Sequence, residues 1–130
     1  MPIDVPGLVS ATDLHATVDG IAEWQLPSGR IPWFPGGHSD PWNHVEAAMA
    51  LDLGGHTAAA DRAYDWLIEL LRDDGSWHQY YIADDAGRTE VEQDKLDANV
   101  CAYIAAGVWH RWLLRSDRGF VESLWPTVEK

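Results

Sequence analysis

Apolar residues recur every three or four positions along most of the chain, which is the spacing of one face of an α-helix. Ser10 or Thr12 can cap a first helix, whose apolar stripe includes Leu14 and Val18. The Pro-Ser-Gly sequence at 27–29 ends this helix.

The second helix has the clearest start signal. Asp40 is a good N-cap, and Pro41 follows at the first helical position, where the missing N–H costs no hydrogen bond. The Ala-rich segment WNHVEAAMALDL then runs to Gly54 and Gly55, and a glycine there can adopt the left-handed conformation that ends a helix. We therefore predict a helix between the Asp-Pro pair and the Gly pair.

Three further segments carry helical spacing. Thr57 is expected to cap a third helix, which closes at the RDDGSW sequence. A polar loop is expected at 78–93, a fourth helix at 94–114, and a fifth segment capped by Asp117. No stretch alternates apolar and polar residues over a useful length, so the sequence predicts an all-α fold. The apolar stripes consist of Tyr64, Leu67, Ile68 and Leu71 in the third helix and of Leu96, Val100, Ile104, Val108 and Trp112 in the fourth.

A faint internal repeat organises these helices. Placing Gly29 on Gly75, an offset of 46 residues, also places Ile21 on Leu67. Each block runs from a helix through a Gly-containing turn and an aromatic loop to an Ala-rich helix. The chain, residues 1–130, is therefore predicted to be one domain of two antiparallel helical hairpins and the start of a third.

Charge and composition narrow the function classes. The formal net charge of −12 would repel phosphate backbones and anionic lipid surfaces, so nucleic acid is not an expected partner. No apolar run approaches the roughly 20 residues that span a bilayer, and the N-terminus lacks a signal-peptide pattern. The single cysteine, Cys101, fits a reducing compartment and is interpreted as a buried apolar residue within a helix. We expect a cytoplasmic location.

Two short motifs resemble those of known families. The sequence DDGSW at 73–77 resembles the Gln-Trp motif of terpenoid cyclases and prenyltransferase-type α/α toroids. The sequence SDRGFVESLWPTVEK at 116–130 resembles a helix start of six-hairpin glycosidases, and the whole chain looks like actinobacterial proteins named as prenyltransferases.

The resemblance implies a partial α/α toroid, in which helical hairpins form inner and outer rings around a cavity. A complete toroid needs about six hairpins, and this chain holds about two and a half. It is therefore either a piece that lacks the C-terminal remainder of the toroid or a protein that completes its ring by self-association. The chain lacks the acidic motifs that isoprenoid enzymes use for protonation and for diphosphate binding.

These patterns leave three functions open. The first is a carbohydrate-active, glycoside-hydrolase-like protein that binds an oligosaccharide or other small ligand at an aromatic and acidic rim. The second is a prenyltransferase-like or terpenoid-cyclase-like protein that handles an isoprenoid. The third is a non-catalytic helical binding module or a truncated fragment.

In the toroid arrangement, the second and fourth helices are the inner ones and ligands meet their N-terminal ends. Aromatic rings beside carboxylates and amides suit a sugar, and pockets commonly join apolar walls to a few polar groups. The same residues could instead fill gaps between helices or cap their ends. The candidate ligand-binding residues are Trp33, His38, Asp40, Trp42, Asn43, Glu46, Trp77, His78, Tyr80 and Asn99.

Asp97 is the candidate for a general acid or base, although hydrolysis of a glycoside normally takes two carboxylates. No metal site or cofactor is predicted, because the histidine spacings match no zinc pattern. The three tryptophans of the C-terminal segments, Trp109, Trp112 and Trp125, are interpreted as packing residues between hairpins.

Overall fold

The computed structural model describes residues 7, 8 and 10–130. Part of the N-terminal stretch that was compared with signal peptides, residues 1–6 and 9, lies outside the described residues. In chain order the elements are α1 (Ala11–Trp24), α2 (Pro41–Leu53), α3 (Thr57–Glu69), β1 (Tyr80–Ala83), β2 (Thr89–Gln93), α4 (Ala98–Ala102), α5 (Ile104–Arg115) and α6 (Arg118–Val128).

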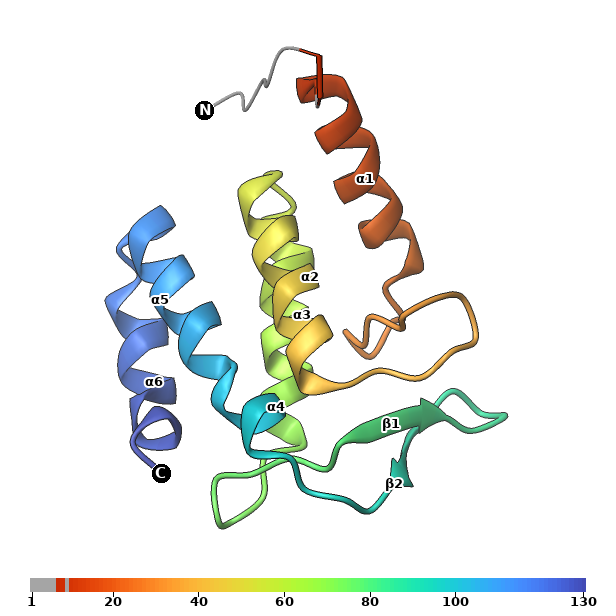
Figure 1. The fold of residues 1–130 in the computed structure, drawn as a ribbon, viewed down its shortest axis with the longest axis vertical. Helices are drawn as coiled ribbons and strands as arrows, with labels where there is room; N and C mark the ends of the chain where they lie inside the picture. Colours follow the sequence, from red (N-terminus) through yellow and green to blue (C-terminus); the bar gives the residue numbers. More distant parts are fainter. Residues whose placement is uncertain (1–6, 9) are drawn as a thin grey trace.

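The fold is mainly helical, as predicted, and α2 lies at its centre (Figure 1). α2 packs against α1, α3 and α5, and α6 packs against the outer side of α5. The two helices expected to be inner, the second and the fourth, thus lie side by side as α2 and α5. The buried residues of the three central helices are chiefly Val45, Ala48, Leu51, Ala60, Ala63, Tyr64, Leu67, Ile104 and Val108.

Gly107 allows α5 to approach α2 closely. A Cβ atom at this position would lie 2.7 Å from both the Tyr64 hydroxyl and a methyl group of Val45. The space that a side chain would need is already filled by the core, so only glycine permits this helix contact.

The polar loop expected at 78–93 is a two-stranded antiparallel hairpin, and the prediction of no strand was wrong. β1 pairs with β2 from Ala83 opposite Thr89, and Gly87 closes the turn with a φ of +78°. Only Tyr81 of β1 is buried and β2 is almost wholly exposed. A narrow hairpin with so little burial leaves no alternating pattern in the sequence, which is why periodicity missed it.

Local capping determines where most helices begin. Ser10 and Asp13 form a capping box at the start of α1, and Asp40 and Asp117 cap α2 and α6 as predicted. The prediction of Thr57 as a cap was wrong, because it is the first residue of α3 and its neighbour His56 makes no side-chain cap.

The fourth helix begins later than predicted. Asp97 caps α4, and a break at Tyr103 separates α4 from α5. Leu96 therefore precedes the helix and is half exposed, although Val100 and Val108 are buried as expected. Apolar residues at helical spacing on the N-terminal side of a strong cap do not lengthen the helix. The cap's side chain accepts hydrogen bonds from the first backbone N–H groups, and so fixes where the helix begins.

A buried ion-pair network holds α2, α3 and α5 together. Arg111 donates from Nε to Asp52 at 2.9 Å and from Nη1 to Asp61 at 2.7 Å. Arg115 also donates to Asp52. Without the two arginines, the buried carboxylate of Asp52 would destabilise the fold, since an unpaired buried charge is strongly unfavourable.

Candidate functional site

A buried arginine fixes the loop that precedes α2. Arg30 is 1% exposed, and its Nη1 donates to the carbonyl oxygens of Gly37 and Tyr81 and to the Ser39 hydroxyl, at 3.0, 3.3 and 3.2 Å. Ser39 and Tyr81 also exchange backbone hydrogen bonds of 2.8 and 2.9 Å. The loop is therefore tied to β1 through both backbone and side-chain contacts.

A tight turn at the tip of this loop presents aromatic side chains. The Gly37 N–H donates to the Phe34 carbonyl at 2.8 Å across a Pro-Gly pair, and Gly36 has a φ of +79°, as a type II turn requires. The Trp33 N–H donates to the His38 carbonyl at 2.9 Å, which sets these two side chains next to each other.

His44 supports the loop from below. Its Nδ1 accepts from the Ile31 N–H at 3.3 Å, and its Nε2 donates to the Ala63 carbonyl at 2.9 Å. Complete burial lowers the pKa of His44 from 6.5 to about 4, so the ring is neutral at pH 7. This histidine is a structural residue of α2 rather than a ligand contact.

A hollow of about 220 Å³ opens at the start of α2, and we call it the α2 hollow. Its lining joins residues of the loop and of α2 to residues near β1 and α4 that are distant in sequence. The lining residues are Trp33, Asp40, Trp42, Asn43, Gln79, Tyr80 and Val100. Five of the candidate ligand-binding residues are thus brought together in one place.

Asp40 organises the floor of the α2 hollow. Its Oδ2 accepts from the Trp33 indole N–H at 2.6 Å and from the Asn43 side chain at 2.8 Å. Its Oδ1 accepts from the Asn43 backbone N–H at 3.0 Å as the helix cap. The carboxylate thereby holds one aromatic ring and one amide, and the Oδ1 of Asn43 accepts no hydrogen bond from the described residues.

Glu46 fixes the second tryptophan. Its Oε1 accepts from the Trp42 indole N–H at 3.1 Å and from the Tyr103 hydroxyl at 2.9 Å. The Trp42 and Tyr103 rings stack with centroids 4.5 Å apart and planes 11° apart. One face of Trp42 is therefore covered, and the hydrogen bond from Tyr103 to Glu46 raises the tyrosine pKa.

His38 and Tyr80 complete the aromatic wall. Their rings stack at 4.6 Å, and Trp33 meets the His38 ring edge-on at 4.5 Å. The Nδ1 of His38 lies 3.1 Å from a carboxylate oxygen of Glu92 on β2. The hairpin that periodicity missed thus supplies one side of the site.

The other candidate residues lie outside the lining of the α2 hollow. Trp77 is 1% exposed in the core, where its indole donates to the Leu67 carbonyl at 2.8 Å. His78 lies 2.9 Å from an oxygen of Asp94. Asp97 accepts from the backbone N–H groups of Asn99 and Val100 at 2.9 and 3.4 Å, so the structure gives it a capping role.

A second hollow of about 340 Å³ adjoins the first, and we call it the Trp24 hollow. It lies between the end of α1 and the start of α2, and Trp33 and Asn43 line both hollows. Sequence reasoning missed Gln79 and Tyr103 in the first region and Trp24 in the second. The only sequence signal for Gln79 was its place in HQYY, between the predicted site residues His78 and Tyr80. Tyr103 and Trp24 reach their hollows through packing between helices, which the sequence pattern does not show.

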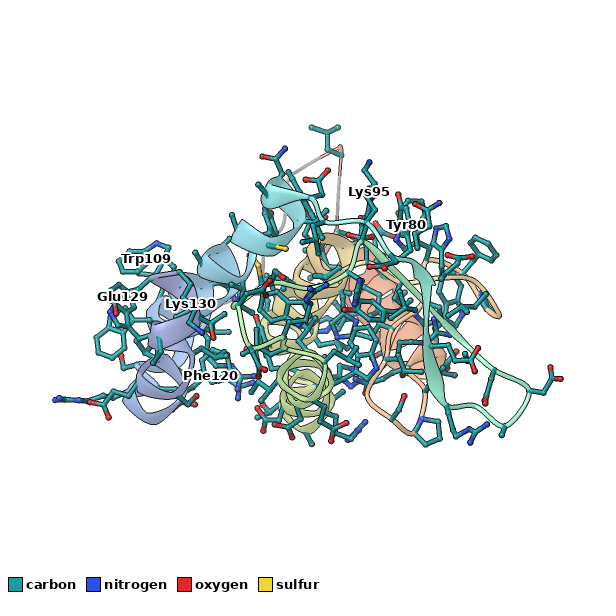
Figure 2. All side chains as sticks on the ribbon, turned by 90° about the horizontal axis from the view of Figure 1, so that it is seen from below. Tyr80, Lys95, Trp109, Phe120, Glu129 and Lys130 are labelled. Atoms are coloured by element: carbon teal, nitrogen blue, oxygen red, sulfur yellow. The ribbon has the colours of Figure 1, made fainter. Side chains whose placement is uncertain are left out.

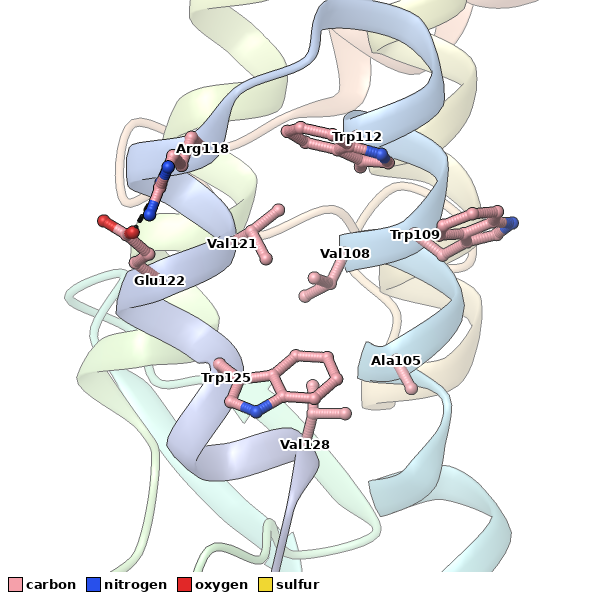
Figure 3. A pocket seen from close by; sticks show the side chains of 9 residues that line it. All are labelled: Ala105, Val108, Trp109, Trp112, Arg118, Val121, Glu122, Trp125 and Val128. Atoms are coloured by element: carbon pink, nitrogen blue, oxygen red, sulfur yellow. Dashed lines mark hydrogen bonds and ion pairs between the residues drawn. The ribbon is translucent and has the colours of Figure 1, made fainter.

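A third hollow, of about 430 Å³, lies between α5 and α6 (Figure 3). Trp109, Trp112 and Trp125 line it and remain 60%, 40% and 48% exposed. The Arg118–Glu122 ion pair at its edge supplies its charged groups. Figure 2 shows Trp109 and Tyr80 on opposite sides of the molecule, so this hollow is separate from the α2 hollow.

Within the described ranges, no group of three or more His, Cys, Asp or Glu side chains could hold a metal ion. None of the helices seen in residues 10–130 is long and apolar enough to cross a membrane.

Comparison with known proteins gives two relatives, and no protein-family model matches the chain. The chain is 46% identical over 126 residues to an MMP endo-(1,4)-3-O-methyl-α-D-mannosidase of Mycolicibacterium hassiacum, across 97% of this chain and 34% of that protein. It is 34% identical over 84 residues to an uncharacterized glycosyl hydrolase of Methanocaldococcus jannaschii, across 64% of this chain and 13% of that protein. The chain spans about a third of the length of the first relative and less of the second. Both relatives have glycoside-hydrolase names and neither is named as a prenyltransferase, so the sequence similarity is to glycosidase-like proteins.

Proposed function

We propose that the α2 hollow binds a mannose-containing glycan and that this chain is a glycan-contacting part of a glycoside hydrolase. The observation that carries the proposal is the joint lining of the α2 hollow by Trp33, Trp42 and Tyr80 together with Asp40 and Asn43. The similarity to an endo-mannosidase over nearly the whole chain supports the same ligand class.

The geometry suits a sugar for two reasons. Trp33 and Trp42 are held by hydrogen bonds to Asp40 and Glu46, so their rings are fixed before a ligand arrives and little ordering cost is added on binding. Polar groups placed among apolar walls can then bind hydroxyl groups. No Lys or Arg lines the α2 hollow, which favours a neutral glycan over an acidic one.

Hydrolysis places a further demand on the site, because glycosidases normally use two carboxylates. Asp40 is the carboxylate that lines the α2 hollow, and Glu46 holds Trp42 at its edge. We propose Asp40 as the acidic group nearest the sugar. The catalytic role suggested for Asp97 stays a prediction.

A non-catalytic glycan-binding role is the second candidate. Both oxygens of Asp40 already accept hydrogen bonds within the protein, three in all, which suits a positioning group better than a proton donor. The isoprenoid alternative has less support, because no Lys or Arg side chain lines the α2 hollow to bind a diphosphate.

Calorimetric titration with (1,4)-linked 3-O-methyl-α-mannose oligosaccharides and with unmethylated α-mannose oligosaccharides tests the binding proposal. We expect saturable binding that weakens on the order of tenfold in Trp42→Ala and in Asn43→Ala, since tenfold corresponds to about 1.4 kcal/mol. Trp109→Ala removes an exposed tryptophan from the α5–α6 side and should bind like the wild type. A wild-type protein that binds none of these glycans would overturn the proposal.

Product analysis after incubation with the same glycans separates the two candidates. Hydrolysis that is lost in Asp40→Asn while binding is kept would support the hydrolase reading. Binding without hydrolysis by the wild type would support the non-catalytic module.

A further inference from the structure

The Trp24 hollow shares two lining residues, Trp33 and Asn43, with the proposed glycan site. Because Trp33 and Asn43 line both hollows, the two spaces lie next to each other along these side chains. The remaining lining residues are Ile21 and Trp24 of α1, Ile31 and Pro32 of the loop, and Ala47 of α2.

Size indicates that the α2 hollow is only part of the site. Its volume of about 220 Å³ lies below the range of about 300–1,000 Å³ that is usual for ligand pockets. The adjoining hollow of about 340 Å³ brings the combined space into that range.

The side chains of the Trp24 hollow suit the apolar face of a sugar ring. Trp24 is 45% exposed, and its indole N–H donates to none of the described residues. The free Oδ1 of Asn43 supplies an acceptor on the shared wall, and the other side chains named above are apolar apart from the indoles. An aromatic platform with one donor and one acceptor can stack on a ring and still bind its hydroxyl groups.

The walls of this second hollow are held in place before binding. The Ile31 N–H donates to His44 and its carbonyl accepts from Ser39 at 2.8 Å. Gln25, directly after Trp24, donates to the carbonyls of Gly29 and Ala59 at 3.0 and 2.9 Å, which anchors the end of α1. A rigid surface of this kind loses little entropy when a ligand is ordered on it.

We infer that the Trp24 hollow is a second sugar subsite, which takes the residue next to the one in the α2 hollow. The inference rests on the proposed glycan-binding function and adds that two consecutive sugar units are needed to fill the site. Trp24 is then the residue that distinguishes an oligosaccharide from a single sugar.

Affinity as a function of ligand length tests this subsite. Ligand-observed NMR titrations would compare methyl α-mannoside with an α-(1,4)-linked mannose disaccharide and tetrasaccharide. For the wild type we expect the disaccharide to bind on the order of tenfold more tightly than the monosaccharide. Trp24→Ala should remove this preference and leave monosaccharide binding unchanged, whereas Trp42→Ala should weaken both ligands.

Trp24→Phe provides the matched control, because it keeps an aromatic ring on the same side of α1 and should keep most of the length preference. Trp24 is exposed at a helix end, so unfolding midpoints of both variants should stay close to that of the wild type. A length preference that survives in Trp24→Ala would overturn the second subsite and leave the glycan proposal standing. A wild type that binds neither the monosaccharide nor the oligosaccharides would instead contradict the proposed function itself.

Discussion

Arg30 and His44 place two basic side chains beneath the aromatic loop. Arg30 has no ion-pair partner among the described residues, and burial lowers its pKa. Its guanidinium donates to carbonyl and hydroxyl oxygens, and the negative charge of Glu92 partly opposes the lowering of its pKa. The benefit is geometric, because one guanidinium group fixes Gly37, Ser39 and Tyr81 relative to each other and so sets the loop against β1.

His44 makes stability depend on pH. The unfolded chain binds a proton on this ring near pH 6.5, whereas the folded protein binds it only near pH 4. The contribution of His44 is therefore complete above about pH 6.5 and falls as the pH falls from 6.5 to 4, by about 3 kcal/mol in total.

Urea unfolding between pH 7.5 and 4.5 checks this prediction. His44→Gln should show a smaller loss of unfolding free energy over this range than the wild type, because the titrating ring is gone. Equal slopes for the two proteins would mean that the buried ring does not titrate in this window.

Asp97, the predicted general acid or base, is also the N-cap of α4. Its carboxylate accepts from two backbone N–H groups at the start of α4, a short element that leads through Tyr103 into α5. The Tyr103 hydroxyl in turn donates a hydrogen bond to Glu46, and its ring stacks on Trp42. The cap therefore acts on the α2 hollow through the placement of Val100, which lines it, and of Tyr103.

Asp97→Ala is expected to lower the free energy of unfolding by about 1 kcal/mol, since it removes a helix cap. Asp97→Ser can still cap the helix and should restore most of this loss, as measured by urea unfolding. Glycan binding and any hydrolysis should be unchanged in Asp97→Ser. Loss of hydrolysis in a stably folded Asp97→Ser protein would show instead that the carboxylate takes part in chemistry.

At the scale of the whole molecule, the proposed glycan site and the apolar α5–α6 surface lie on different sides. The latter includes Trp109, Trp112 and Trp125, which are all exposed. Large exposed apolar patches commonly mark protein contacts or cause association. The deep ion-pair network on the other side of α5 keeps this helix in place whether or not the surface is covered.

We expect the chain to self-associate through the α5–α6 surface as its concentration rises. The double variant Trp109→Glu with Trp125→Glu should reduce the average mass measured by light scattering, because charges oppose burial of this face. Phe34→Glu places the same charge on the exposed aromatic loop and should leave association unchanged. A wild type that stays monomeric at high concentration would contradict this prediction.

The sequence by itself determined the helix starts at Asp40 and Asp117, narrowed the first helix cap to Ser10 or Thr12, and identified the aromatic surroundings of α2. Caps and turns depend on contacts within a few residues, so a local pattern is enough to identify them. Trp33, Asp40 and Asn43 meet for the same reason, because they lie within a single loop and the helix turn that follows it.

Only the tertiary structure decided which distant residues join this cluster. Tyr103 reaches Glu46 across 57 positions, and Tyr80 reaches the loop through a hairpin whose strands are too exposed to leave a pattern. The same packing buried Trp77 and left Trp24 open, although both are tryptophans near turns. Burial of an aromatic ring depends on which helices close over it, and periodicity along one helix carries no information about its neighbours in space.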